Sequence, residues 1–245
     1  MKELVLTIDR VRRISDTHQH VHLSFEPSLI NLRAGHSLLA RVGDPVEPYL
    51  REHWHPVAVN RQEVIVERPA AFLYMPGTPV TVLSMIGQPF RYRRNLRSVL
   101  FMACDTAPTP LLLALPALIA NHVAVTLVLI GKAAAYKTEH LPPEVEVIAG
   151  DADFNWHNRV TTVGWADQVF VVVDPADEIA YYRRVWALFT ELRAEIPKGY
   201  LFGVFQPPLP CGVGACGACM IRLKGGQGLA CAQGPAFDLQ EMALS

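Results

Sequence analysis

The sequence predicts an α+β protein of three parts: an N-terminal antiparallel β-barrel, an α/β domain with a parallel sheet, and a C-terminal cysteine-rich segment. Three observations predict this order. Short apolar runs separated by glycine and proline fill residues 1–95. Longer apolar runs then alternate with segments of helical periodicity over residues 96–205. Four of the five cysteines lie in the last 35 residues.

The bulk composition excludes some classes of function. Lys and Arg total 22 and Asp and Glu total 23, which leaves no basic excess for nucleic acid. The N-terminal residues lack the apolar core of a secretory signal. The apolar stretch 107–131 contains Pro116, Asn121 and His122, so it predicts a buried helix and a buried strand rather than a membrane span. We therefore expect a soluble, cytoplasmic protein without a membrane span.

The first part, residues 1–95, reads as a series of short strands. Turn residues such as Gly35, Gly43 and Gly77 separate the apolar runs. Many short strands with close turn signals favour a small antiparallel barrel. The expected strands are 4–8, 18–25, 37–42, 57–59, 63–67 and 79–85.

The second part, residues 96–205, has the pattern of an α/β domain. Its strands are nearly continuous apolar runs, as is usual for parallel strands buried on both faces. The expected strands are 98–103, 123–130, 145–148 and 168–173, and the expected helices are 109–120 and 179–196. Pro197 and Gly199 end the second helix. Strands that alternate with helices predict a parallel sheet.

The third part, residues 206–245, begins with a linker that has three prolines between 207 and 210, which excludes a helix or a central strand. The cysteines then follow the pattern C-x4-C-x2-C with one later cysteine, which is the plant-type [2Fe–2S] spacing. Small residues between them let the backbone approach a cluster closely. The predicted metal ligands are Cys211, Cys216, Cys219 and Cys231.

Two other interpretations of these cysteines stay open. They could form a zinc site with four thiolates, or stay reduced without a metal. Structural zinc sites usually place their cysteines as two C-x2–4-C pairs. Here three cysteines stand together and the fourth stands alone, so the spacing favours the [2Fe–2S] cluster.

With a barrel, an α/β domain and a C-terminal cysteine segment in that order, the chain resembles the ferredoxin–NADP reductase superfamily. It is most similar to the iron–sulfur electron-transfer subunit of dihydroorotate dehydrogenase. The resemblance covers nearly the whole chain and is strongest at residues 211–219 (CGVGACGAC) and 231–237 (CAQGPAF). It implies an FAD-binding barrel, a Rossmann-like nucleotide-binding domain and a [2Fe–2S] segment. It also implies electron flow between NAD(H), FAD, the cluster and a flavin in a catalytic partner.

The barrel motif that holds FAD in this superfamily is changed here. The family has an arginine for the pyrophosphate and a hydroxyl near the flavin, whereas this chain reads His55-Pro56-Val57-Ala58. A neutral histidine offers fewer donors than the planar fork of arginine, and Ala58 offers none. These four residues form a degenerate FAD-like site. The resemblance implies FAD as a cofactor, but the residues present argue against it.

The nicotinamide motif is changed further. The family has a glycine-rich turn after the first α/β strand, and residues 104–110 read CDTAPTP at this place. Thr109 and Pro110 match the family, but the glycines are absent, and Asp105 would repel a phosphate. Thr109 and Pro110 therefore form a degenerate NAD-like site, and NAD(P) is not expected to bind.

The sequence thus predicts an iron–sulfur electron-transfer protein or subunit that passes single electrons to or from a protein redox partner. The resemblance implies that this partner is the catalytic subunit of a flavin dehydrogenase. One alternative is a complete NAD(P)H–FAD–[2Fe–2S] oxidoreductase subunit of the dihydroorotate dehydrogenase type. Another is a non-catalytic scaffold or sensor with a structural cluster. No Ser-His-Asp or paired-carboxylate arrangement predicts a catalytic residue.

Two groups of histidines allow more than one interpretation. The histidines at 18, 20 and 22 alternate along a strand and so share one face. A metal could bind there, but no carboxylate of matching spacing accompanies them, so an exposed strand face is the simpler interpretation. His53 and His55 flank Trp54 and are either a remnant of a flavin site or packing residues. Cys104 is expected to be a small core residue.

Overall fold

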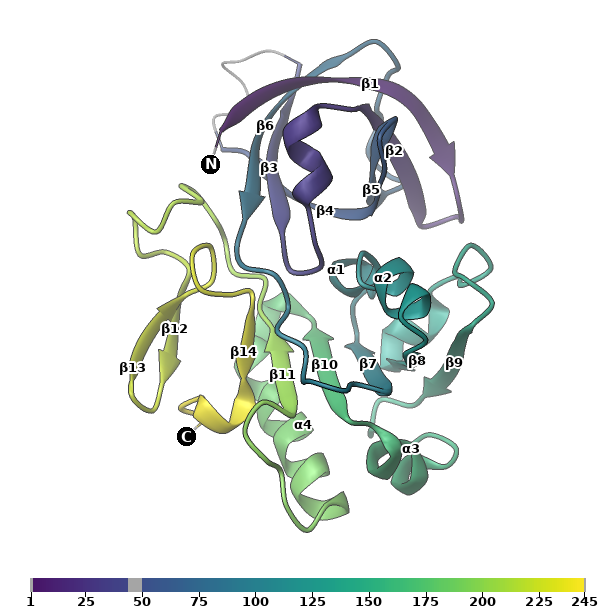
Figure 1. Cartoon of the computed structure of the whole chain (residues 1–245), viewed down its shortest axis with the longest axis vertical. Helices are drawn as coiled ribbons and strands as arrows, with labels where there is room; N and C mark the ends of the chain where they lie inside the picture. The colour runs from purple at the N-terminus through teal and green to yellow at the C-terminus, as the bar shows by residue number, and fades with distance from the viewer. Residues whose placement is uncertain (1, 44–49, 245) are drawn as a thin grey trace.

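The computed structural model describes residues 2–43 and 50–244. The chain forms a closed barrel, a six-stranded sheet flanked by helices, and a C-terminal segment with a two-stranded sheet (Figure 1). The predicted fold class is therefore confirmed. The division at residues 95 and 205 stays a prediction, and the C-terminal segment contributes a strand to the six-stranded sheet.

The barrel is antiparallel, with strand order β1-β2-β5-β4-β3-β6. Burial alternates along β6, where Val80, Val82 and Ser84 point inward, as expected for a half-buried strand. The interior is apolar and contains the fully buried ring of Trp54. The strands are β1 (Glu3–Arg13), β2 (His18–Ser24), β3 (Ser37–Val42), β4 (Glu52–Val59), β5 (Glu63–Pro69) and β6 (Pro79–Ile86), with a short 3-10 helix, η1 (Pro27–Asn31).

All six predicted barrel strands are present, but β1 continues to Arg13, beyond the predicted range 4–8, and β4 is longer than predicted. It begins at Glu52 instead of Val57 and runs through Pro56. The register with β5 shifts between Pro56 and Ala58, which marks a bulge. Proline is tolerated in strands at bulges, but it interrupts the sequence pattern of a strand, so the predicted strand begins only after Pro56.

The six-stranded sheet has the order β14-β11-β10-β7-β8-β9 and is parallel except for β14. Every residue of β7 and of β10 is buried, which confirms the prediction of parallel strands covered on both faces. The strands are β7 (Ser98–Cys104), β8 (Ala124–Ile130), β9 (Val145–Gly150), β10 (Gln168–Val173), β11 (Leu201–Val204) and β14 (Ala236–Asp238).

The helices differ from the prediction in three ways. The predicted helix 109–120 is two helices, because Pro116 lies in the first turn of the second one, where its missing N–H costs nothing. The predicted helix 179–196 ends at Leu192. A helix over 159–165 was not predicted. The helices are α1 (Thr109–Leu112), α2 (Leu115–Ala120), α3 (Arg159–Trp165) and α4 (Glu178–Leu192), and short 3-10 helices are η2 (Gly131–Ala135), η3 (Pro175–Asp177) and η4 (Leu239–Glu241).

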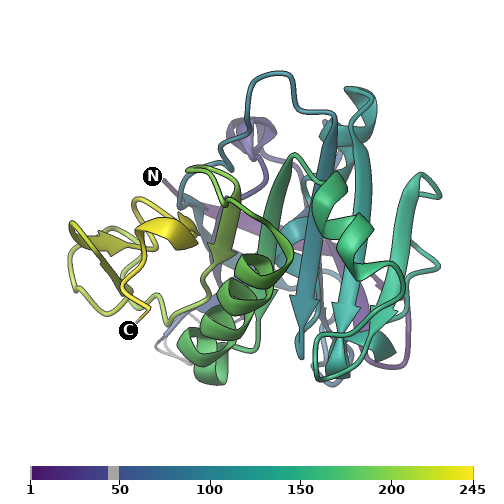
Figure 2. The same ribbon diagram turned by 90° about the horizontal axis from the view of Figure 1, so that it is seen from below.

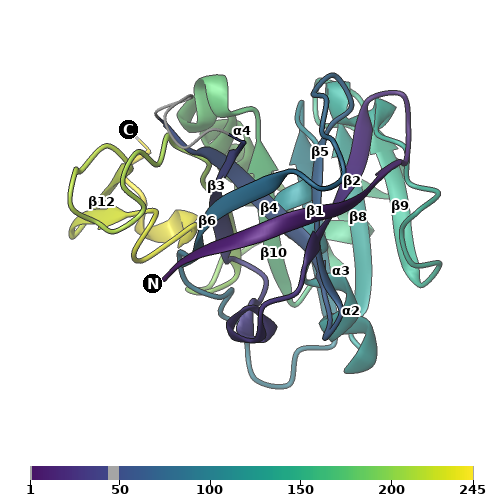
Figure 3. The ribbon, with the colours of Figure 1, turned by 90° about the horizontal axis from the view of Figure 1, so that it is seen from above.

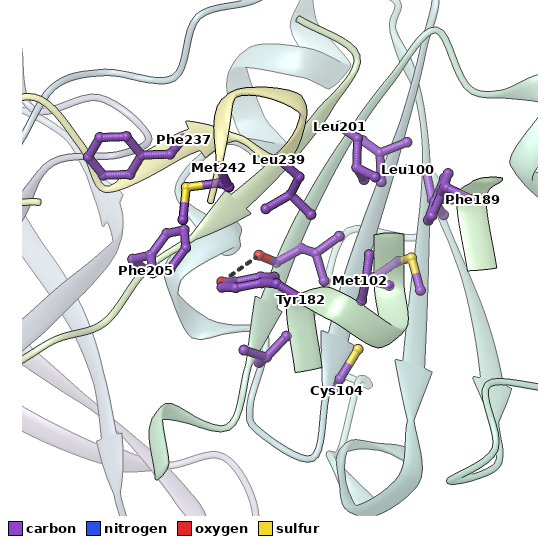
Figure 4. Packing of buried hydrophobic residues seen from close by; sticks show 14 of the residues in the cluster. Leu100, Met102, Cys104, Tyr182, Phe189, Leu201, Phe205, Phe237, Leu239 and Met242 are labelled. Atoms are coloured by element: carbon purple, nitrogen blue, oxygen red, sulfur yellow. Dashed lines mark hydrogen bonds between the residues drawn. The ribbon is translucent and has the colours of Figure 1, made fainter. Parts of the chain in front are cut away.

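The two faces of the sheet have different neighbours. Helix α4 lies across one face, and the C-terminal segment lies beside the sheet (Figure 2). On this face Tyr182 packs in the core (Figure 4), and its hydroxyl also donates to the Val204 carbonyl of β11 at 2.9 Å. The other face packs against α1 and α2 and includes Val57 of the barrel. The barrel and the sheet thus share a continuous apolar contact.

The apolar stretch 107–131 folds into helices α1 and α2 and strand β8, where one helix and one strand were predicted. In the part of the chain that the structure describes, no helix has the length and apolarity to cross a membrane.

Candidate iron–sulfur site

The C-terminal segment lies beside the β3–β6 side of the barrel (Figure 3). Three hydrogen bonds join the end of β6 to it, one of them from the Gln88 N–H to the Gly234 carbonyl at 2.5 Å. The Gly87 N–H donates to the Cys231 carbonyl, and the Gln88 side chain donates to the Ala232 carbonyl, both at 2.9 Å. The barrel therefore fixes the backbone that carries the last cysteine.

Cys219 and Cys231 form an inner pair of thiols. Strands β12 (Met220–Leu223) and β13 (Gly226–Leu229) make a hairpin in which Met220 lies opposite Leu229. This register places both cysteines just beyond the open end of the hairpin, where the Ala230 N–H donates to the Cys219 carbonyl. Their sulfurs are 3.2 Å apart and both residues are buried. Burial raises the pKa of the Cys231 thiol, and the neighbouring Cys219 raises it further.

Cys211 and Cys216 form an outer pair. The Val213 N–H donates to Cys211 Sγ at 3.4 Å, and the amide and thiol of Cys216 also face this sulfur. These donors lower the pKa of Cys211 to about 6, because hydrogen bonds to a thiolate favour the charged form. Cys216 is exposed, whereas the inner pair is not. The Gly214 N–H joins the two pairs, since it donates to Cys231 Sγ at 3.2 Å.

The loop between the cysteines depends on glycine. Gly212, Gly214 and Gly217 have φ angles of 65°, 76° and 72°, which favour residues without a Cβ. At Gly212 a Cβ would also lie 2.7 Å from the Leu39 side chain of the barrel. The glycines thus let the loop turn tightly and lie against the barrel.

These residues fit a [2Fe–2S] cluster. Each iron of such a cluster takes two cysteine thiolates. The structure brings four thiols together as two pairs and directs backbone N–H groups at their sulfurs. Such N–H groups stabilise negative sulfur, and metal binding releases the remaining thiol protons.

The predicted FAD-like residues lie in β4, on the side of the barrel that faces α1. Burial holds the pKa of His55 well below its usual value, and the nearby His53 and Arg68 add to this effect. A half-buried, neutral imidazole is a poor partner for a pyrophosphate, because it carries no positive charge. Val57 packs in the same apolar cluster as Leu111 and Leu112 of α1. Side chains of the protein itself therefore fill the seam next to His55-Pro56-Val57-Ala58.

The predicted NAD-like residues, Thr109 and Pro110, begin helix α1. The Thr109 hydroxyl donates to the carboxylate of Glu67 in the barrel. In the preceding loop, Asp105 accepts hydrogen bonds from the Lys132 N–H at 2.7 Å and from the Tyr181 hydroxyl. Its carboxylate thus lies in the turn that follows β7. Neither the hydrogen bond of Thr109 to Glu67 nor the carboxylate of Asp105 in this turn favours binding of a nicotinamide dinucleotide. Cys104 is fully buried.

The expectation of an exposed histidine face on β2 is wrong. His22 is buried, and only 16% of the His20 side chain is exposed. Glu67 lies directly opposite His20 in the register of β2 and β5. His140, from the segment after η2, approaches the same carboxylate. Sequence spacing missed this group because its members are far apart in the chain.

Comparison with known proteins gives two findings. The family model for the iron–sulfur cluster binding domain of dihydroorotate dehydrogenase B matches residues 208–243. The comparison with curated proteins found no match.

Solved structures with a similar fold cover most of the chain. The NADH-dependent reduced ferredoxin-NADP oxidoreductase has 16% identity and a TM-score of 0.72, over 97% of this chain and 89% of that one. Phthalate dioxygenase reductase has 13% identity and a TM-score of 0.56, over 91% and 87% of the two chains. The cytochrome b5 reductase domain of Ulva prolifera nitrate reductase has 13% identity and a TM-score of 0.57, over 82% and 97%.

At these identities the solved structures establish the fold, and the family model establishes the character of the C-terminal segment. The chain thus carries a cluster-binding segment like that of dihydroorotate dehydrogenase B on a reductase-type fold, which is the architecture of an iron–sulfur electron-transfer protein or subunit.

Proposed function

We propose that this chain is an electron-transfer subunit that carries single electrons between protein partners and has no flavin or nicotinamide of its own. Cys211 and Cys216 would hold one iron, and Cys219 and Cys231 the other. The observation that carries the proposal is the arrangement of these thiols in two pairs, with the Val213 and Gly214 N–H groups directed at the sulfurs. A [2Fe–2S] cluster bound there supplies one-electron redox chemistry.

The contacts between the two domains support the absence of a flavin. FAD in a reductase of this fold would have to lie between β4 and the start of α1. Here Val57 packs against α1, and Thr109 is hydrogen-bonded to Glu67. Opening this seam would break a hydrogen bond to a buried carboxylate, which costs about 1.5–3 kcal/mol. These contacts therefore favour a closed interface between the barrel and the α/β domain over one that holds a flavin.

The surface around the outer cysteines supports a protein partner. Cys216 is exposed, and the apolar side chains of Val213 and Met220 are exposed as well. Apolar side chains next to a redox centre favour docking of another protein, because they bury apolar area on contact. We propose that the partner is the catalytic subunit of a flavin dehydrogenase. We also propose a cytoplasmic location, because five free cysteines suit a reducing compartment.

The test is an anaerobic purification followed by assays of iron, sulfide, zinc and flavin on one sample. We expect about two irons and two sulfides per chain and no flavin. FAD added to the protein should not be retained. Dithionite should bleach the visible bands, and NADH and NADPH should not.

Three results would overturn the proposal. One FAD per chain with rapid bleaching by NADH would indicate a complete NAD(P)H–FAD–[2Fe–2S] oxidoreductase. A colourless protein with one zinc in the four cysteines would exclude electron transfer through this segment. A cluster that no flavoprotein donor or acceptor can reduce or oxidise would favour the scaffold or sensor alternative.

A further inference from the structure

Three side chains of the kind that bind metals meet at the seam between the barrel and the α/β domain. They are His20 of β2, Glu67 of β5 and His140 of the segment after η2, and each offers one ligand atom. The three atoms all lie within 4.8 Å of one another. None of these residues belongs to the cysteine segment. In Figures 1 and 3, β2 and β5 lie on the side of the barrel away from that segment.

The distances suit a shared ion better than direct hydrogen bonds. Glu67 Oε2 lies 3.6 Å from His20 Nε2 and 3.6 Å from His140 Nε2. This separation is too long for a good hydrogen bond. Two ligands of a tetrahedral zinc, each about 2.0–2.1 Å from the ion, lie about 3.3–3.4 Å apart. Small side-chain movements would therefore bring all three atoms to a zinc ion.

The burial of Glu67 is a second reason to expect a metal ion at this group. The side chain of Glu67 is 0% exposed, and its only ion-pair partners among the described residues are these two histidines. Buried charges are usually paired with a cation or bound to a metal. His20 Nε2 is itself buried and has no hydrogen-bond partner in the described part of the chain. A metal ion would satisfy both groups at once.

The remaining contacts hold the carboxylate in place. The Thr109 hydroxyl donates to Oε1, and the Tyr136 hydroxyl donates to Oε2 at 2.7 Å. Such hydrogen bonds orient a metal-binding carboxylate and are a usual feature of protein metal sites. The Tyr136 hydroxyl is also within hydrogen-bond distance of His140 Nε2, at 3.0 Å. A zinc ion bound to His140 Nε2 would replace this contact. A small cavity of about 150 Å³, lined by His18, Lys132 and Tyr136 among others, lies next to this group.

From this geometry we infer that His20, Glu67 and His140 bind one Zn²⁺ ion that links the barrel to the α/β domain. The ligands are His20 Nε2, Glu67 Oε2 and His140 Nε2. Two imidazoles and one carboxylate are a common ligand set for zinc, with a fourth position open to water or to another group. Octahedral Fe²⁺ suits the site less well, because its neighbouring ligands lie only about 3.0 Å apart and it needs three further ligands.

The test uses the full chain with its cysteine segment loaded with iron and sulfide. The protein is incubated with ZnCl₂ and desalted, and zinc, iron and sulfide are measured together. We expect one zinc per chain in addition to the iron and sulfide. Zinc K-edge X-ray absorption should show nitrogen and oxygen neighbours at about 2.0–2.1 Å and no sulfur at about 2.3 Å. This result is independent of the electron-transfer proposal, because the zinc ligands do not include a cysteine.

Three variants locate the ion. His140→Ala removes one ligand, and Glu67→Gln keeps the size of the side chain but removes its charge. Each should weaken zinc binding by more than about 100-fold, beyond the effect of losing a supporting hydrogen bond. Both should keep their iron and sulfide, which shows that they are folded. His157→Gln is the control, because His157 is exposed just before α3 and is not a member of this group; it should bind zinc as the wild type does.

Four outcomes would overturn the inference. The loaded protein could retain no zinc, or hold it with sulfur neighbours in the cysteine segment. The wild type, His140→Ala and Glu67→Gln could bind zinc equally well. Iron in excess of two per chain that disappears in His140→Ala would assign the site to iron instead of zinc.

Discussion

Glu67 of β5 and Thr109 of α1 are joined by a hydrogen bond that crosses the seam between the barrel and the α/β domain. Burial raises the pKa of this carboxyl, but the neighbouring imidazoles of His140 and His20 and the hydroxyl groups of Thr109 and Tyr136 outweigh it and hold the pKa well below its usual range. Glu67 is therefore ionised and buried. A charged group in this position makes the seam a specific contact between two otherwise apolar surfaces.

Thr109→Val should destabilise the protein by about 1.5–3 kcal/mol, because it removes a donor to a buried charge while keeping the shape of the side chain. Urea unfolding followed by circular dichroism measures the change. Thr161→Val is the matched control, since Thr161 is exposed in α3, and it should change stability by less than about 0.5 kcal/mol. Equal stability of the two variants would show that the hydrogen bond to Glu67 contributes nothing.

Cys216→Ser should lose most of the iron and sulfide, because an alcohol is a much weaker ligand for iron than a thiolate. The variant should stay folded, since Cys216 is exposed and packs in no core cluster. Cys104→Ala is the control: this cysteine is buried in β7 and should keep two irons per chain at some cost in stability. Iron and sulfide analysis checks both. Full cluster content in Cys216→Ser would remove this residue from the ligand set.

Gly212→Ala should lower cluster retention more than any other single glycine change in the loop. It combines a φ of 65° with a Cβ only 2.7 Å from the Leu39 side chain. Gly217→Ala isolates the backbone effect, because it has a φ of 72° and no atom near its Cβ. At Gly225 the φ angle is not in the left-handed region and no atom lies near an added Cβ, so Gly225→Ala serves as the control.

The measurement for this series is the rate of cluster loss in urea, read from the visible absorption. We expect loss to be fastest for Gly212→Ala, intermediate for Gly217→Ala and unchanged for Gly225→Ala. The backbone strain alone costs about 1–2 kcal/mol. Equal rates for Gly212→Ala and Gly225→Ala would show that the barrel does not restrain this loop.

The sequence alone was enough to predict the fold class and the cysteine segment, because both depend on local signals. Buried parallel strands such as β7 appear as continuous apolar runs, and the cluster spacing is contained within 21 residues from Cys211 to Cys231. The boundaries of elements depend on features that the local sequence does not mark. Pro56 sits in a bulge of β4, and a bulge leaves no clear mark in the sequence of one strand.

The group around Glu67 could not be predicted because it depends on register between distant strands. His20 meets Glu67 only through the pairing of β2 with β5, and His140 arrives from the other domain. No carboxylate close in sequence to the histidines on β2 therefore marks this group. The outer and inner pairing of the four cysteines was also not predicted, because it depends on the hairpin of β12 and β13.

Glu178 predicts a pH dependence of stability. Its carboxylate accepts a hydrogen bond from the Gln206 N–H in the linker to the cysteine segment, at 2.6 Å, and burial raises its pKa to about 7. The unfolded chain releases this proton near the ordinary value of 4.5. Between these two values the folded state binds more protons than the unfolded state. The contribution of Glu178 to stability is therefore present at low pH and is lost as the pH rises through about 7.

Glu178→Gln should remove this dependence, because glutamine does not titrate and its amide oxygen can accept the same N–H. Relative to the variant, the wild type should lose about 1 kcal/mol between pH 5.5 and 8, after a discount for the partial exposure of the side chain. Urea unfolding of both proteins across this range measures the difference and cancels titrations that they share. Glu195→Gln, an exposed change beyond α4, should follow the wild type at every pH. A constant difference between the wild type and Glu178→Gln would mean that Glu178 ionises at the same pH in the folded and unfolded chains.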